Sequence, residues 1–88
     1  LREEKGGECV QTLTGHTSFV DSVCALPDGR LASGSLDCTI RIWDLGKGGE
    51  CVQKLDRRFN PDEVWAVCAL ADGQLVSGSA DNTVRIWW

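Results

Sequence analysis

Apolar residues along this chain gather in short runs that are separated by turn-forming residues. The runs at 19–26 and 64–70 are nearly continuous, which is typical of strands buried on both faces. An Asp-Gly pair follows each run, at 28–29 and at 72–73, and such pairs favour tight hairpin turns. No segment shows the spacing of an amphipathic helix. The chain is therefore predicted to be all-β.

Two more strands are predicted after each hairpin turn. Segments 30–35 and 74–79 contain small residues, which let a neighbouring sheet approach closely. Segments 39–43 and 83–87 alternate β-branched and polar side chains, as half-buried strands do. Each half of the chain is therefore predicted to contain three consecutive strands.

The chain repeats itself at a fixed interval. Residues 23–43 and 67–87 are identical at 15 of 21 aligned positions, at an offset of 44. The sequence GGECVQ also occurs twice, at 6–11 and at 48–53, and both copies lead into alternating residues typical of an outer strand. The glycine-rich linker 45–49 before the second copy is predicted to be a flexible turn. A period of about 40–45 residues with short strands is typical of propeller blades.

The first copy contains Gly15-His16, Ser33-Gly34-Ser35, Asp37 and Trp43-Asp44, and the second contains Ser77-Gly78-Ser79, Asp81 and Trp87. These repeated motifs resemble those of the WD40 repeat family, whose members are β-propellers of four-stranded blades. The second copy departs from the family pattern, because Arg57-Arg58 stands in place of Gly-His and Trp88 in place of Asp. The resemblance implies two WD40 blades with four-stranded antiparallel sheets, in a ring that one chain leaves incomplete.

The resemblance also implies a domain organisation. Residues 1–88 form a single WD40 region, with repeat 1 at 14–55 and repeat 2, lacking its outer strand, at 56–88. Segment 8–13, from Glu8 to Leu13, is expected to be an outer strand donated to close a ring. Because a propeller needs about four to eight blades, two explanations stay open. Either copies self-associate by exchanging this strand, or the chain is a fragment of a longer protein, such as a seven-bladed regulatory WD40 protein.

In the WD40 family, four side chains of a repeat form a structural tetrad. By resemblance, the Trp43 indole donates to Ser33, Ser33 contacts His16, and His16 contacts Asp37. Such a network satisfies buried polar groups and ties the outer loop to the inner strands. These residues are therefore expected to be structural.

In the second repeat the tetrad is incomplete. Ser77, Asp81 and Trp87 remain, but no histidine accompanies them. We hypothesise that Arg58 takes the histidine's place and pairs with Asp81. The alternative is that Arg58 is simply solvated.

The types of residue in the tetrad also raise the possibility of a hydrolase built on His16, Ser33 and Asp37. The chain has a single histidine and no GxSxG nucleophile elbow. No carboxylates are spaced as a general acid–base pair. We therefore expect no catalytic residue and no enzyme.

Composition narrows the function classes further. The net charge of −4, with no basic cluster beyond Arg57-Arg58, argues against nucleic acid or an acidic membrane as partner. No apolar run approaches the roughly 20 residues of a membrane span. Four of the five cysteines form two repeat-related pairs in apolar segments without CxxC spacing, and we expect small buried residues of a reducing, intracellular and cytoplasmic protein. A disulfide framework or a zinc site is the alternative, and we expect neither a metal nor a cofactor.

Surface recognition remains as the expected activity. In WD40 proteins, partners bind where the loop leading into the innermost strand meets the channel. We expect a non-enzymatic interaction scaffold that binds a protein or peptide; the alternative is a self-assembling propeller that binds small ligands or glycans between blades. Phe19 and Trp65 stand out because aromatic residues dominate binding hot spots, although each could instead pack between blades. Carried over to this chain, the candidate positions are Phe19, Asp21, Leu36, Glu63, Trp65 and Ala80.

Overall fold

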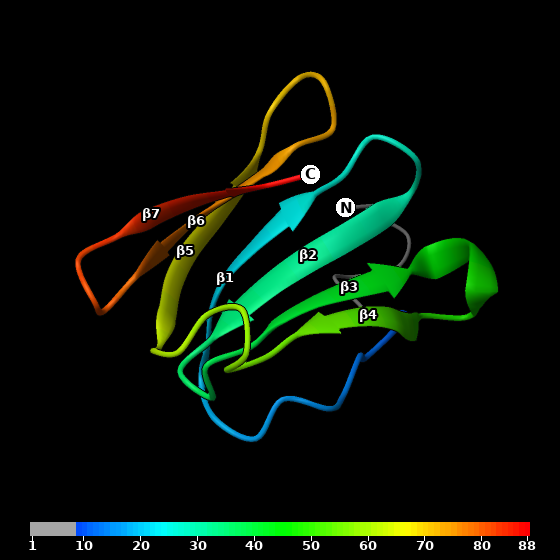
Figure 1. Ribbon diagram of the computed structural model, residues 1–88. Helices are drawn as coiled ribbons and strands as arrows, with labels where there is room; N and C mark the ends of the chain where they lie inside the picture. The colour runs from blue at the N-terminus through cyan, green and yellow to red at the C-terminus, as the bar shows by residue number, and fades with distance from the viewer. Residues whose placement is uncertain (1–8) are drawn as a thin grey trace.

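A computed structural model describes residues 9–88, in which seven strands form two antiparallel sheets (Figure 1). The prediction of an all-β chain with antiparallel sheets is confirmed. Blade 1 has the strand order β1-β2-β3-β4, and blade 2 has the order β5-β6-β7. The strands are β1 Val20–Ala25, β2 Arg30–Ser35, β3 Ile40–Asp44, β4 Glu50–Leu55, β5 Val64–Ala69, β6 Leu75–Ser79 and β7 Val84–Trp87.

The turns between strands use left-handed backbone conformations. Gly29 and Gly73 close the β1–β2 and β5–β6 turns with φ angles of 83° and 91°, which glycine adopts without steric cost. Cys38 and Asn82 take the same role after β2 and β6, with φ angles of 69° and 71°. Asparagine tolerates this region better than most residues, so the tight turn is more strained in blade 1.

The linker between β3 and β4 contains a single 3-10 turn, Leu45–Lys47, where the sequence had predicted a flexible turn without helix. The side chain of Asp44 accepts a hydrogen bond from the Gly46 N–H at 2.9 Å. Gly48, with φ of 74°, ends the turn and donates its N–H to the Leu45 carbonyl. Local capping by Asp44 therefore orders this linker.

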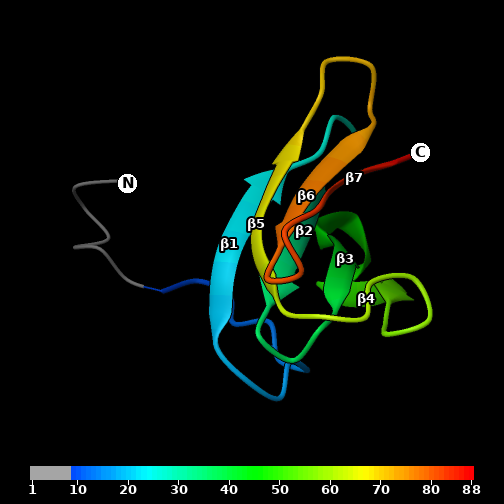
Figure 2. The ribbon, with the colours of Figure 1, turned by 60° about the vertical axis from the view of Figure 1, so that its left-hand side comes forward.

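The hydrophobic core lies between the two blades, where β1 and β5 run side by side (Figure 2). Gly34 permits the close approach, because a Cβ at this position would lie 2.6 Å from Cγ1 of Val64. The Ser22 hydroxyl also accepts the Val67 N–H at 3.0 Å across the junction. The buried core residues are Leu26, Ala32, Ile40, Ile42, Val64, Val67 and Leu75.

The prediction that both apolar runs are buried on both faces is wrong for this single chain. Val23 of β1 is 66% exposed, whereas its repeat equivalent Val67 in β5 is 7% exposed. The reason is that blade 1 has a neighbour on one face only. The five cysteines are free thiols, and the expectation that they are buried holds only for Cys38, since Cys9 and Cys68 are exposed.

The part of segment 8–13 that the structure describes, residues 9–13, forms no strand in the single chain. Glu8 lies outside the described residues. Gln11 and Leu13 pack beside Gly49 of blade 1. Donation of this segment to another copy stays a prediction. Within residues 9–88, no helix has the length and apolar character needed to cross a membrane.

Candidate functional site

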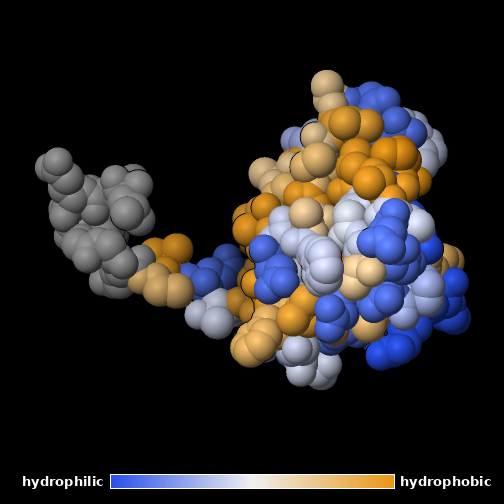
Figure 3. Space-filling view, turned by 90° about the vertical axis from the view of Figure 1, so that its left-hand side faces the viewer, coloured by the Kyte–Doolittle hydropathy of each residue, from blue (hydrophilic) through white to orange (hydrophobic). Residues whose placement is uncertain are grey.

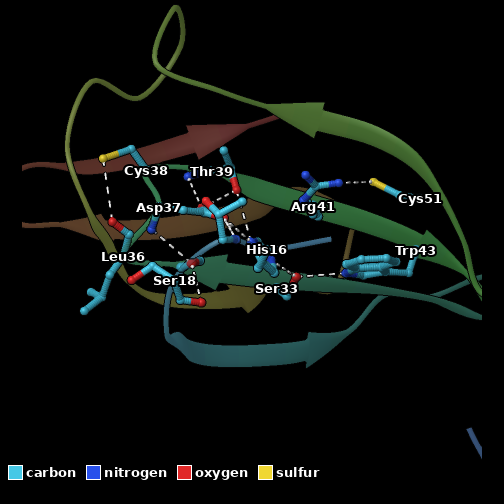
Figure 4. Close-up of polar contacts among 12 residues, drawn as sticks. His16, Ser18, Ser33, Leu36, Asp37, Cys38, Thr39, Arg41, Trp43 and Cys51 are labelled. Atoms are coloured by element: carbon cyan, nitrogen blue, oxygen red, sulfur yellow. Dashed lines mark hydrogen bonds and ion pairs between the residues drawn. The ribbon is translucent and has the colours of Figure 1, made fainter. Parts of the chain in front are cut away.

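A chain of hydrogen bonds joins Trp43, Ser33, His16 and Asp37 in blade 1 (Figure 4). The Trp43 Nε1–H donates to Ser33 Oγ at 2.8 Å, and Ser33 Oγ lies 2.6 Å from His16 Nε2. His16 Nδ1 lies 2.8 Å from Asp37 Oδ2. Because an indole N–H can only donate, the Ser33 proton points to His16 Nε2. His16 Nδ1 then carries a proton and donates it to Asp37.

The Asp37 carboxylate is the most heavily bonded group of this tetrad. Burial by itself would raise its pKa, but hydrogen bonds from the Thr39 hydroxyl, the Thr17 N–H and His16 outweigh that effect and lower the pKa to about 2. The same contacts fix the loop before β1 against the turn after β2. The tetrad therefore holds in place the loop that carries Phe19.

Protonation of Asp37 should weaken the fold. A carboxyl with a folded pKa of about 2 and an unfolded pKa near 3.9 contributes stability above pH 4 that is lost as pH falls through about 2. We expect Asp37→Asn to be less stable than the parent by about 2 kcal/mol at pH 7, and the gap to narrow as the pH is lowered from about 4 to about 2.

Urea unfolding followed at several pH values measures this gap. Asp21→Asn, at an exposed position on β1, is the matched control and should change the stability at pH 7 by no more than about 0.5 kcal/mol. A constant gap between Asp37→Asn and the parent across the acidic range would contradict the linkage.

The tetrad distances equal those of a hydrolase Ser-His-Asp arrangement, but the serine is not available for attack. Ser33 is 4% exposed, and its oxygen already accepts the Trp43 N–H. A nucleophile needs access to a substrate carbonyl, and the burial of Ser33 limits that access. The geometry is that of a satisfied buried network.

Blade 2 completes its network differently. The Trp87 Nε1–H donates to Ser77 Oγ at 2.9 Å, repeating the bond of blade 1. Asp81 pairs with Arg85, whose Nη1 lies 3.1 Å from Asp81 Oδ2. The Thr83 hydroxyl and Arg85 hold the pKa of the Asp81 carboxyl below its usual range. Arg85 also donates to the side-chain oxygen of buried Asn60 at 3.2 Å.

The hypothesis that Arg58 replaces the missing histidine is wrong. The exposed Arg58 side chain pairs instead with Asp56, with Nε 3.0 Å from Oδ1. The sequence did contain a signal for the observed partner of Asp81. Arg85 is the repeat equivalent of Arg41, so each blade has an arginine on the strand that follows the aspartate turn. Arg41 lies over the Trp43 ring, 5.9 Å from its centroid, because His16 already occupies the aspartate.

The six candidate binding residues gather at one end of the two blades, here called the aromatic rim. β1 and β5 start at this end, side by side (Figures 1 and 2). The Leu36 N–H donates to the Phe19 carbonyl at 3.0 Å, and the Ala80 N–H donates to the Glu63 carbonyl at 3.0 Å. Each turn after an inner strand is therefore fixed to the residue that precedes the innermost strand of the same blade.

The aromatic side chains of the rim face solvent and not the core. Phe19 is 74% exposed and Trp65 is 55% exposed. The Trp65 Nε1–H donates to Glu63 Oε1 at 3.2 Å, while Asp21 is exposed. Packing between blades, the alternative for both aromatics, is not what the single chain shows.

The rim positions differ between blades although the strands below them are nearly identical. Phe19 and Asp21 of blade 1 are the repeat equivalents of Glu63 and Trp65 of blade 2. Each blade thus presents one aromatic and one carboxylate, in the opposite order. The rim combines apolar surface with negative charge.

Other features of the described chain offer less for binding. A hollow of about 140 Å³ lies between the blades, lined in part by Leu26, Trp87 and Trp88 but not by Trp65. This volume is below the roughly 300–1,000 Å³ of typical small-molecule sites. Among residues 9–88, no three His, Cys, Asp or Glu side chains are grouped as ligands of a metal ion.

Comparison with known proteins places these features in a family. The model of the WD domain, G-beta repeat, matches residues 7–44 and 49–87. The solved WD40 β-propeller domain of Doa1 superimposes with a TM-score of 0.84 at 35% identity, covering 93% of this chain and 27% of that one.

Curated relatives match over one repeat or slightly more. Nuclear distribution protein nudF 2 of Penicillium rubens is 46% identical over 50 residues, which is 56% of this chain and 11% of the relative. Small ribosomal subunit protein RACK1 of Caenorhabditis elegans is 51% identical over 43 residues, 48% of this chain and 13% of the relative. The matched part of the chain thus covers about a tenth of the length of these relatives. Its two family matches, its blade geometry and its likeness to a solved propeller show that it belongs to the WD40-repeat family.

Proposed function

We propose that the aromatic rim binds a peptide segment of a protein partner without chemical change, so that the chain acts as an interaction scaffold. The observation that carries the proposal is the exposure of Phe19 and Trp65 at one end of neighbouring blades. Exposed aromatic side chains on a rigid sheet supply contact area at low entropic cost and are typical binding hot spots.

The charge of the rim indicates the kind of segment that it fits. Asp21 and Glu63 place carboxylates beside the two aromatic side chains, and the whole chain has a net charge of −4. Complementary charge steers association and selects the partner. The proposed ligand is therefore an extended peptide that carries basic and apolar residues.

The hydrogen-bond networks beneath the rim support this role. Asp37 binds the loop before β1 through the Thr17 N–H at 3.0 Å, and the Phe19 carbonyl is bonded to Leu36. The aromatic side chains thus project from backbone that is already fixed. A preorganised site loses less conformational entropy when it binds.

A selection from a random-peptide display library on the immobilised chain tests the proposal. We expect enriched peptides that contain basic and apolar residues and that bind Trp65→Ala at least about tenfold more weakly, because a hot-spot truncation costs roughly 2 kcal/mol. Phe19→Ala should show a loss of the same sign.

Trp88→Ala is the matched control, since Trp88 is an exposed tryptophan at the opposite end of the blade, after β7. Its affinity for the same peptides should equal that of the parent. Equal binding by Trp65→Ala and the parent, or a loss confined to Trp88→Ala, would place the site elsewhere.

A further inference from the structure

The junction between the two blades has a repeat-related counterpart on each free face of the molecule. Val64 and Val67 of blade 2 face blade 1, and their equivalents Val20 and Val23 are exposed and line a shallow hollow of blade 1 to which blade 2 contributes no residue. Reciprocally, Gly34 faces blade 2, and its equivalent Gly78 lies on the far face of blade 2. Each of the two free faces therefore carries one half of an interface that the chain already forms internally.

Burial shows that these free faces lack a neighbour. Val67 is 7% exposed at the internal junction, against 66% for Val23. Ile42 is 5% exposed, against 54% for its equivalent Ile86. Figure 3 views the molecule from the side on which β5, β6 and β7 lie in Figure 1, and apolar side chains are gathered on the surface there. Surface of this kind marks an interaction site.

The shape of the free faces is also complementary. At the internal junction, a Cβ added to Gly34 would lie 2.6 Å from Val64 Cγ1 and 3.1 Å from Val67 Cγ1. Nothing lies within 4 Å of the same point at Gly78. Gly78 therefore leaves open the space that two valine side chains fill at Gly34, and Val20 and Val23 are the valines of equivalent position.

The strand edge of blade 2 repeats this complementarity. In blade 1, β3 pairs with β4 so that Ile40 lies opposite Leu55 and Ile42 opposite Gln53. β7 is the equivalent of β3, and its outer edge has no partner among the described strands. Residues 9–13 are the equivalent of β4, but they lie beside Gly49 of their own blade 1. Within one chain, residues 9–13 therefore lie on blade 1, whereas the strand edge that they would pair with belongs to β7 of blade 2.

We propose that copies of this chain associate head to tail, with the β7 face of one copy seated on the β1 face of the next. Leu13 of the next copy then lies opposite Val84, and its Gln11 opposite Ile86. Such a heterologous contact closes when the rotation permits. Three copies give six blades and four give eight, both within the usual range of propellers. This association goes beyond peptide binding at the rim and does not depend on it.

The junction between copies is weaker than the internal one. The Ser22 hydroxyl bonds the backbone of Val67 across the internal junction, but its equivalent in blade 2 is Ala66, which has no hydroxyl group. The association also loses the entropy of bringing separate chains together. It therefore depends on protein concentration.

The native mass of the 88-residue chain, measured by light scattering over a concentration series, tests the proposal. We expect a discrete species of three or four times 9.6 kDa. Gly78→Glu should be a single copy with an unchanged circular dichroism spectrum, because the new side chain meets nothing within its own chain. Lys47→Gln, which changes the net charge by the same amount in the 3-10 turn, should associate like the parent.

A cross-linking experiment decides the question if Gly78→Glu proves to be unfolded. The Cβ position of Gly34 lies 3.4 Å from Val64 Cβ, close to the separation that a disulfide requires. Chains with Val20→Cys mixed with chains with Gly78→Cys should form a covalent dimer under mild oxidation. Each variant alone, like the parent with its native cysteines, should form far less.

A parent chain that remains a single copy at micromolar concentration would overturn the proposal, as would a mixture that gives no more dimer than the separate variants. That result would indicate that further blades of one polypeptide cover the free faces. An assembled parent whose mass is unaffected by Gly78→Glu would show that the copies meet through a different surface. Neither outcome bears on the rim, whose peptide affinity is measured separately.

Discussion

Ser33→Ala should lower the free energy of unfolding by about 3 kcal/mol, because it leaves two polar groups without their partner. The Ser33 hydroxyl accepts the Trp43 N–H at 2.8 Å and lies 2.6 Å from His16 Nε2. Both Ser33 and Trp43 are buried. Each unpaired buried group costs about 1–3 kcal/mol, whereas an exposed one is satisfied by solvent.

Ser77→Ala is the matched control, because Ser77 is equally buried but serves one partner, the Trp87 N–H. Its loss should be about 1 kcal/mol. Urea unfolding of both variants gives the two values directly. Equal losses would mean that the bond to His16 contributes nothing, and that the tetrad is no more than a tryptophan–serine pair.

The strands of this protein could be predicted from sequence because their determinants are local. The Asp-Gly pairs at 28–29 and 72–73 place hairpin turns, and each predicted strand from residue 19 onward matches the observed one to within a residue or two at either end, whereas residues 9–13 form no strand. The internal repeat then predicts a four-stranded blade, in which an outer strand lies beside a group of three strands. The observed order β1-β2-β3-β4 follows directly.

The partners of charged side chains could not be predicted in the same way. From the sequence alone, either Arg58 or Arg85 could pair with Asp81. In the structure, only Arg85 is fixed on a strand beside Asp81. Arg58 lies in the loop after β4 and bonds the nearer Asp56. A long flexible side chain binds the carboxylate that local backbone geometry presents first, and spacing along the sequence does not determine which one that is.

The burial of the strands was the other point that pattern alone missed. β1 has the composition of a strand buried on both sides, yet Val20 and Val23 are exposed. The composition of a strand indicates the surroundings for which that strand is suited. For β1 these surroundings include a neighbouring blade on the exposed face, which the single chain lacks. That mismatch between pattern and exposure is the physical basis for expecting another blade on this face.

Gly34→Ala should lower the free energy of unfolding by about 3 kcal/mol, at the upper end of the range for overpacking. The added Cβ would lie 2.6 Å from Val64 Cγ1, and Val64 is fully buried at the centre of the core. The valine cannot move away without displacing β5. Because Gly34 has no left-handed backbone, the loss arises from packing and not from conformational strain.

Gly78→Ala separates packing from strand propensity, since it makes the same change at the equivalent position where nothing lies within 4 Å. At a concentration where the chain is a single copy, it should be neutral or slightly stabilising, because alanine loses less entropy than glycine in a strand. In the Gly34→Ala/Val64→Ala double variant, the smaller partner makes room for the new methyl group. Its loss should therefore be clearly smaller than the sum of the two single losses. Strict additivity would show that Gly34 and Val64 are not in contact, and that some other feature sets the spacing between the blades.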